Sequence, residues 1–315
     1  MLNLGVKEAM HFGRCHPILE KPYPLPQDGP RTQKFLRLPF SGRRKVFVGA
    51  PILGHEEWKG MIYPENIRSS RVLEHYSQVF NSLELNSSFY AQPSGSQIKK
   101  WKQAIDPNFR FVAKVPRKVS ENISSSQAVN DFADFAGVIA EFGENLGLAF
   151  MQLSETYSKD KAGQLYSFLN KIKGQLPLAV ELRHPQWFHD HCLADDLVNH
   201  LYVNGFVPVI TDTIGKRYAL HTSLTGQKIM IRFLAYDHDS DRERFADWVM
   251  RIEDWLSHGM DEVYFFIHHE DHKKIPRMVQ EFTRMIFRKL GHEMDHRLIL
   301  DLDVTPVHQP TLFTV

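Results

Sequence analysis

The sequence has few cysteines and no excess charge of either sign. Its 315 residues include only Cys15 and Cys192, too few for a disulfide framework or a four-cysteine metal site. The 38 Lys and Arg residues are balanced by 37 Asp and Glu residues, which excludes the bulk charge of a histone-like or polybasic protein. Any contact with a nucleic acid would therefore need a local basic patch.

Long apolar segments are also missing. No run approaches the roughly 18 apolar residues of a membrane span. Residues 1–11 lack the contiguous apolar stretch of a secretory signal peptide. Together with the low cysteine content, these absences predict a cytoplasmic protein with no membrane partner.

Proline is concentrated near the N-terminus. Six of the 17 prolines precede residue 45, in a segment with neither helical nor strand periodicity. We expect residues 1–44 to form a proline-rich leader, either an extended arm or a disordered segment. Residues 45–291 would then form one folded domain, and residues 292–315 a C-terminal extension.

Short apolar runs alternate with longer segments of helical spacing in residues 45–291. Eight runs are typical of β-strands and begin near Val46, Ser82, Phe109, Gly147, Leu178, Phe206, Lys228 and Asp261. Two helices are expected to begin at capping-box pairs, Ser94 with Gln97 and Ser240 with Glu243. Residues 213–227 have no amphipathic stripe, so we expect no full helix between strands six and seven.

Eight strand–helix units predict an α/β fold, a single TIM-type (β/α)8 barrel. The structural alternative is an open doubly wound sheet. Against it, no Gly-x-Gly-x-x-Gly follows the first strand, and no phosphate-binding Walker loop is present.

Polar residues close most of the expected strands. Because neighbouring side chains on a strand face opposite ways, the leucines of residues 82–86 suit the helix-facing side and leave Glu84 and Asn86 on the barrel interior. Catalytic groups of barrel enzymes lie at these carboxyl ends, which predicts a ligand-binding or catalytic mouth. For single residues the alternatives are a solvated rim side chain, or a structural ion pair of Glu181 with Arg183.

This mouth favours acid/base chemistry on a small polar substrate. The carboxyl groups of Glu84 and Glu181 form the candidate acid/base pair, because apolar walls or a second carboxylate can raise the pKa of one of them. The predicted catalytic residues are Glu84, Glu181, Lys114, His184 and Asp212. The predicted substrate-binding residues are Asn86, Tyr90, Gln152, Arg183, Trp187, Arg232 and His268. Among these, the Lys and Arg side chains would bind an anionic group.

A metal site and an aromatic wall need separate consideration. Glu181 and Asp212 with one histidine of the pair 268–269 could bind a divalent ion, and strand alternation would let only His268 enter the mouth. No zinc-binding spacing supports this site, so no cofactor is predicted and a divalent metal is a minor alternative. Trp187, after the fifth strand, suits stacking on a sugar or base, or a hydrophobic plug over the barrel end.

Two strings in the sequence are specific enough to compare with known families. They are Glu84-Leu85-Asn86-Ser87-Ser88-Phe89-Tyr90 and Glu181-Leu182-Arg183-His184-Pro185-Gln186-Trp187-Phe188. Both resemble the YecE-like proteins, also called domain of unknown function 72. The resemblance covers about residues 45–291 and implies a TIM-type barrel with no assigned activity. The sequence departs from the family pattern at two places. It lacks the family's Gly-Thr-Ser-Gly-Trp after the first strand, and it has His268-His269 where the family has Asn-Asn. The second departure weakens the case for a metal site shared with the family.

The leading functional prediction is an enzyme acting on a small polar or phosphorylated, sugar-like substrate; isomerase, lyase and hydrolase are not distinguished. The first alternative is a protein that processes or binds nucleic acids or phosphodiesters, which would need a basic groove. The second is a non-catalytic ligand-binding protein, whose mouth charges would all be mutually paired and leave no open cavity.

Overall fold

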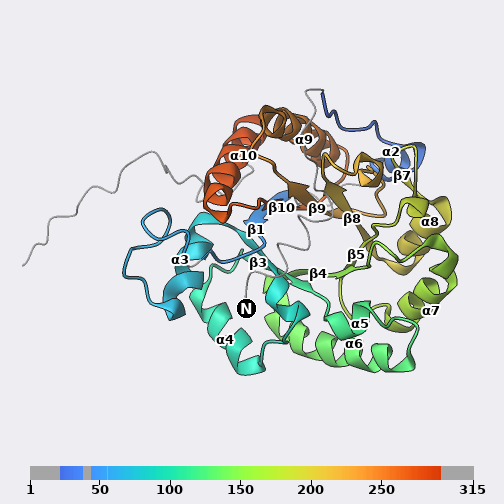
Figure 1. The fold of residues 1–315 in the computed structure, drawn as a ribbon, viewed down its shortest axis with the longest axis horizontal. Coiled ribbons are helices and arrows are strands. Elements are labelled where there is room, and N and C mark those ends of the chain that lie inside the picture. The colour runs from blue at the N-terminus through green and yellow to red at the C-terminus, as the bar shows by residue number, and fades with distance from the viewer. Residues whose placement is uncertain (1–21, 38–43, 55, 292–315) are drawn as a thin grey trace, which may run out of the picture.

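The computed structural model describes residues 22–37, 44–54 and 56–291. In these residues eight parallel strands close into a barrel in the order β1-β10-β9-β8-β5-β4-β3-β2, surrounded by helices (Figure 1). The strands are β1 (Lys45–Ala50), β2 (Ser82–Leu85), β3 (Arg110–Lys114), β4 (Leu146–Gln152), β5 (Leu178–Glu181), β8 (Val207–Asp212), β9 (Lys228–Leu234) and β10 (Glu262–His268). Each begins within one residue of its predicted start, which confirms the TIM-type barrel.

The helices connect successive strands along the outside of the barrel. They are α3 (Val72–Val79), α4 (Gly95–Ala104), α5 (Arg117–Ser120), α6 (Ser126–Ile139), α7 (Ala162–Ile172), α8 (Asp195–Asn204), α9 (Asp239–Ser257) and α10 (Ile275–Leu290). Short 3-10 turns are η1 (Ser69–Arg71), η2 (Asn86–Phe89), η3 (Ala140–Asn145), η4 (Lys159–Lys161), η5 (Pro185–Trp187), η6 (Arg217–Ala219) and η7 (His272–Lys274). A two-residue hairpin loop joins β6 (Phe188–His189) to β7 (Cys192–Leu193) beside the barrel. Of the described helices, none is both long and apolar enough to cross a membrane.

The predicted helix starts are confirmed for one helix and shifted for another. Ser94 caps α4, because its hydroxyl accepts from the backbone N–H of Gln97 at 3.2 Å. The predicted cap Ser240 lies inside α9, and His238 takes the capping position. Its Nδ1 accepts from the backbone N–H of Ser240 at 3.2 Å, and the Asp241 carboxylate accepts from the backbone N–H of His238. An unprotonated imidazole nitrogen can thus replace a hydroxyl as the N-cap acceptor.

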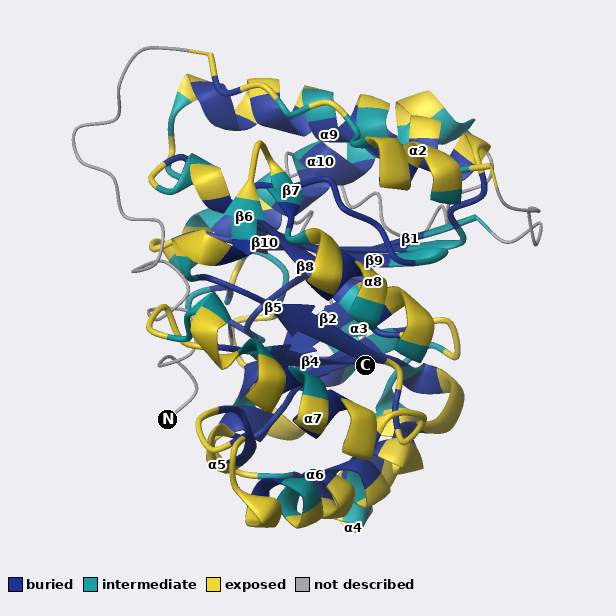
Figure 2. Cartoon of the chain, turned by 90° about the vertical axis from the view of Figure 1, so that its right-hand side faces the viewer, coloured by how far each residue is buried: buried dark blue, intermediate teal, exposed yellow. Residues whose placement is uncertain are grey.

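The buried side chains form two layers. One layer packs between the strands and the helices, as where Phe265 of β10 stacks on Phe282 of α10 with ring centroids 4.0 Å apart. The other fills the barrel interior and includes Phe47 stacked on Tyr264 at 4.8 Å. Figure 2 shows the same division, with buried faces of the helices turned towards the strands and exposed faces outward. The apolar interior layer supports the polar ends of the strands.

The segment between β8 and β9 has only the short turn η6 among its described residues, as predicted. Here the N-terminal arm, residues 22–37 with helix α2 (Pro30–Phe35), covers the barrel next to α8 (Figure 1). The Thr32 hydroxyl donates to the carbonyl of Thr222 at 2.7 Å and accepts from the Leu224 amide at 3.2 Å. The Asp28 carboxylate accepts from Arg251 at 2.6 Å and from the Trp255 indole at 2.8 Å, both on α9. The predicted leader thus includes a docked arm; residues 1–21, 38–43 and 292–315 lie outside the described chain.

Candidate functional site

The site forms because six strands place a polar side chain two residues after a buried apolar one. In a strand these two side chains point to the same face, so each polar group stands directly above the apolar interior layer. The pairs are Val112 with Lys114, Phe150 with Gln152, Ala179 with Glu181, Val209 with Thr211, Met230 with Arg232, and Phe266 with His268. The carboxyl ends of the strands therefore form one polar layer inside the barrel.

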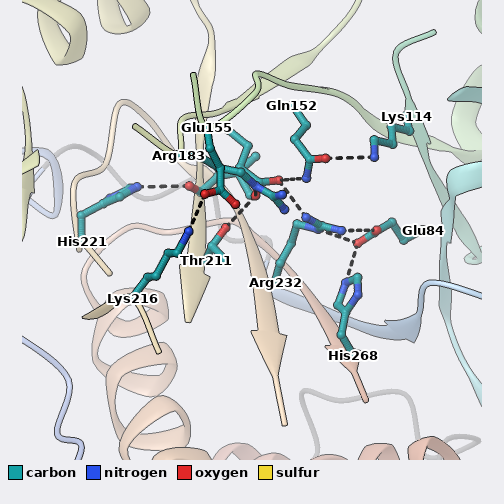
Figure 3. A network of polar contacts seen from close by, with 12 residues as sticks. Glu84, Lys114, Gln152, Glu155, Arg183, Thr211, Lys216, His221, Arg232 and His268 are labelled. Carbon is teal, nitrogen blue, oxygen red and sulfur yellow. Dashed lines mark hydrogen bonds and ion pairs between the residues drawn. The ribbon is translucent and has the colours of Figure 1, made fainter. Parts of the chain in front are cut away.

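Arg232 of β9 is at the centre of this layer (Figure 3). Its Nη2 and Nε donate to the carboxylate of Glu84 on β2 at 2.9 and 3.1 Å, and its Nη1 donates to Glu181 on β5 at 2.8 Å. His268 Nε2 lies 3.1 Å from Glu84 Oε2, and Asn86 Nδ2 donates to Glu84 Oε1 at 2.9 Å. The guanidinium thus joins two carboxylates from opposite parts of the barrel.

A second group of donors surrounds Glu181. They donate to its two oxygens at 2.8 to 3.1 Å and come from β4, the end of β5 and β8: Gln152, Arg183 and Thr211. Lys114 of β3 extends the network, since its Nζ donates to Gln152 Oε1 at 3.0 Å. Together with the Glu84 group, these contacts make one buried network, which we call the mouth network: Glu84, Asn86, Lys114, Gln152, Glu181, Arg183, Thr211, Arg232 and His268.

The positive groups of the mouth network keep both carboxyl groups, Glu84 and Glu181, ionised. Burial would raise the pKa of Glu84, but Arg232 and His268 outweigh it and hold that pKa well below its usual range. Burial is likewise overcome for Glu181, where Arg183 and Arg232 lower the pKa to about 2. The expectation that one of the two carboxyl groups has a raised pKa is therefore wrong.

The pKa values of Lys114 and His268 are lowered as well, which for these basic groups favours the neutral form. Burial, followed by the positive charges of Arg232 and Arg183, lowers the pKa of the Lys114 amine to about 8. Burial also lowers the pKa of His268, although Glu84 acts against that shift. A neutral His268 that donates from Nε2 to Glu84 keeps Nδ1 as an acceptor, and this buried atom has no hydrogen-bond partner among the described residues.

Most of the predicted site residues come together in the structure. One further residue, Thr211, follows from the alternation of side chains along a strand. Eight of the predicted residues belong to the mouth network; Thr211 was not predicted. Val209 is a buried interior residue, and Thr211, two residues later on the same strand, must face the same way. This spacing was the sequence signal for Thr211. His268 is the last residue of β10 and His269 follows it; only His268 enters the barrel, as predicted. His269 turns away, and its Nδ1 accepts from the Asp271 amide at 2.9 Å.

Asp212 is not in the mouth, which corrects the prediction. It follows Thr211 and so points outward, where its carboxylate accepts from Arg217 at 2.7 Å, Arg244 at 3.0 Å and the Trp248 indole at 2.8 Å. The possible metal set of Glu181, Asp212 and His268 is therefore not assembled. No group of three or more His, Cys, Asp or Glu side chains in the described part of the chain is placed to hold a metal ion.

Two further predicted residues have local structural contacts. His184 Nδ1 accepts from the Gln186 amide at 3.3 Å and caps η5. Trp187 is fully buried in the outer layer, and its indole donates to the Tyr157 carbonyl at 2.8 Å, so it offers no face for stacking on a substrate. The hydrophobic alternative for Trp187 fits the structure. Both residues are held by the turn that Pro185 begins, outside the mouth network.

A pocket of about 410 Å³ lies beside the mouth network, and we call it the α4 pocket. Its walls are residues 51–53 after β1, residues 83–87 at the end of β2, residues 90–93, and Gln97 and Trp101 of α4. Tyr90, predicted to bind substrate, is at its rim with 42% of its surface exposed. The volume is in the range of roughly 300–1,000 Å³ that small-molecule sites occupy.

Comparisons with known proteins agree with this fold. The family described as "Protein of unknown function DUF72" matches residues 47–297. The UPF0759 protein YecE of Escherichia coli K12 is 26% identical over 253 residues, which cover 74% of this chain and 90% of YecE. Two crystal structures of DUF72 family proteins share the fold. The one from Enterococcus faecalis has a TM-score of 0.61 at 18% identity, covering 78% of this chain and 98% of that one. The one from Thermotoga maritima has a TM-score of 0.58 at 22% identity, covering 77% and 99%.

Proposed function

The chain belongs to the DUF72 family of proteins of unknown function, and on that premise we propose that it is an enzyme. Its substrate would be a small anionic molecule, such as a phosphorylated sugar, bound by the mouth network. The reaction would include a proton transfer at that site. The family carries no assigned activity, so support for this proposal comes from the geometry of the site alone.

The observation that carries the proposal is the charge of the mouth network. Three cationic groups, Lys114, Arg183 and Arg232, face two carboxylates, Glu84 and Glu181, with His268 neutral. Arg183 and Arg232 pair with these carboxylates, whereas the Lys114 amine has no carboxylate within salt-bridge distance among the described residues. A buried unneutralised charge costs several kcal/mol, so an anionic ligand that completes the balance is strongly favoured.

Lys114 is the cation with the fewest internal partners. Among the described residues no carboxylate lies within salt-bridge distance of its Nζ, which contacts Gln152 and lies 4.2 Å from the centroid of the Phe89 ring. An amine whose pKa is about 8 exists in both protonation states near neutral pH. We therefore assign to Lys114 two roles, binding the anionic group and transferring the proton.

The carboxylates have a positioning role in this scheme. Glu84 accepts from Arg232, Asn86 and His268, and Glu181 is similarly enclosed, so neither has an oxygen available for a proton. They fix the guanidinium of Arg232 towards the substrate. The acid/base role predicted for these two carboxylates thus passes to Lys114.

The non-catalytic alternative is less well supported. It requires a mouth in which every charge has a charged partner and no cavity is open. Lys114 does not meet the first condition, and the α4 pocket does not meet the second.

The direct test compares Lys114→Met with Lys118→Met, a matched control on α5 whose exposed side chain pairs with Asp131. Inorganic phosphate is titrated into each full-length protein by calorimetry at pH 7. We expect saturable binding by the wild type and the control, and at least roughly tenfold weaker binding by Lys114→Met, because a buried charge-assisted contact contributes about 1.5–3 kcal/mol. Affinity of the wild type should fall as pH rises above 8, when Lys114 loses its proton.

Turnover provides the second readout. A panel of sugar phosphates is incubated with the wild type and followed by phosphorus and proton NMR. Conversion of a panel member that Lys114→Met does not catalyse would support the enzymatic role. Equal phosphate affinity in the wild type and Lys114→Met would contradict the proposed anion site.

A further inference from the structure

The α4 pocket has a composition unlike that of the mouth network. Its walls are mainly apolar, with Leu53 from the loop after β1 and Trp101 from α4 among them. Of the residues that line it, only Glu84 is charged, and that carboxylate already accepts from Arg232, Asn86 and His268. An ionic ligand would therefore find no unused counter-charge there, whereas an uncharged one would gain from apolar contact.

One wall of the α4 pocket is a rigid flat surface. The indole of Trp101 is stacked on Phe142 with an interplanar angle of 10° and on Phe111 with an angle of 24°. These contacts fix the orientation of the indole before any ligand binds. A flat ligand that packs on a preordered aromatic side chain loses little side-chain entropy.

Two amide groups of the pocket supply the polar contacts. Asn86 is 5% exposed, and its Nδ2 donates to Glu84 Oε1 at 2.9 Å and to the Pro51 carbonyl at 3.2 Å. Those two acceptors determine which end of the amide is nitrogen, so the remaining Oδ1 is an acceptor. It is buried and has no partner among the described residues, as is the Nε2 donor of Gln92. Buried polar atoms of folded proteins nearly always have a partner.

We infer that the α4 pocket binds a planar, uncharged ring or amide that carries an N–H donor beside an acceptor. The N–H group would donate to Asn86 Oδ1, the acceptor would receive a bond from Gln92 Nε2, and the flat face would pack against Trp101. This site goes beyond the proposed anion-binding role and does not depend on it, because none of the cations of the mouth network lines the pocket. Nucleobases and aromatic carboxamides belong to this chemical class.

The test uses adenine and benzamide as probes, titrated into the full chain by ligand-observed NMR. We expect saturable binding with a Kd on the order of 1 mM or tighter. The indole of Leu53→Trp should fill the pocket and weaken the binding of both probes at least roughly tenfold. The matched control Met250→Trp adds the same side chain at a position on α9 that is 54% exposed and should change nothing. Gln92→Leu, which removes the side-chain amide with its Nε2 donor, should weaken adenine binding by about three- to tenfold.

Two outcomes would overturn the inference. The first is equal affinity for adenine in the wild type, Leu53→Trp and Gln92→Leu, or no saturation in the wild type. The second is binding of benzoate as tight as that of benzamide, because an anion should not enter this pocket. Inorganic phosphate is titrated into the same proteins. Urea denaturation of Leu53→Trp checks that the variant is folded, whether or not phosphate binds. Unchanged phosphate affinity in that variant then separates failure of this site from failure of the proposed anion site.

Discussion

Two buried networks of arginine and carboxylate groups lie on opposite faces of the same strands. In the mouth network, Arg232 joins Glu84 and Glu181 inside the barrel. Outside it, Arg244 joins Asp212 of β8 to Asp241 at the start of α9, and we call this the outer network, which also includes Arg217 and Trp248. Both are almost fully buried, so burial and ion pairing do not by themselves distinguish a functional site.

The charge balance of the two networks differs. In the outer network two arginines face two carboxylates, and further donors bond to the Leu234 carbonyl and to backbone carbonyls of the N-terminal arm. Arg244 Nε is buried and has no hydrogen-bond partner among the described residues. These contacts connect β8 to α9 and to η6, and η6 to the N-terminal arm, which is a structural role. The mouth network includes Lys114, whose amine has no carboxylate within salt-bridge distance among the described residues, and it lies at the carboxyl ends of the strands. The proposed ligand binding rests on this lysine rather than on the ion pairs.

Removal of Arg232 should have the largest effect. Arg232→Met leaves two buried carboxylates without their common partner, and we expect a loss of about 3–5 kcal/mol in the free energy of unfolding. Urea denaturation at pH 7 measures it. Adding Glu84→Gln and Glu181→Gln should recover part of the loss, because neutral amides need no counter-charge. A loss below about 1 kcal/mol for the single variant would show that the two networks are not comparable.

The next prediction separates the two networks by function. Asp212→Asn removes the charge that Arg217 and Arg244 share and places an NH2 group among donors, so we expect a loss of roughly 2–3 kcal/mol in unfolding free energy. Phosphate affinity should stay within about twofold of the wild type. A large loss of phosphate binding in a folded Asp212→Asn protein would assign a ligand-binding role to the outer network as well.

The third prediction concerns the pH dependence of stability. The pKa of Lys114 is about 8 in the folded protein and about 10.4 in an unfolded chain. Between these values the unfolded chain binds more protons, so this lysine makes stability rise with pH, by at most about 1.4 kcal/mol per pH unit. The stability of the wild type relative to Lys114→Met should therefore increase from pH 8 to 10. Lys118→Met, at an exposed position, should follow the wild type over the same range.

The barrel could be predicted from the sequence because each of its strands is recognised from a few neighbouring residues. Each strand is a short apolar run, and the absence of a stripe in residues 213–227 was visible without coordinates. The inward positions of Glu84 and Glu181 also followed from alternation within a few residues. The assignment failed for Asp212 because a charged residue at a strand end was preferred to its uncharged neighbour Thr211.

Other properties of the site arise from contacts between distant residues. Glu84 and Arg232 are 148 residues apart in the sequence, and their contact is what holds the pKa of Glu84 low instead of raised. The roles of His184 and Trp187 depend on a turn whose contacts with residue 157 and its neighbours cannot be read from a strand pattern. Residue types and faces were therefore predictable, whereas protonation states and partners were not.

The docked N-terminal arm has a consequence for how the barrel is completed. The arm covers the sector between α8 and α9, where the chain itself provides only η6, and its bonds to that sector join residues 190 to 227 positions apart. Such distant contacts are slow to form, because a long loop must close before they contribute. In a newly made chain the arm therefore cannot form its bonds to α9 until α9 has been synthesised. The family match begins only at residue 47, so this late closing step belongs to a part of the chain that the family pattern does not include.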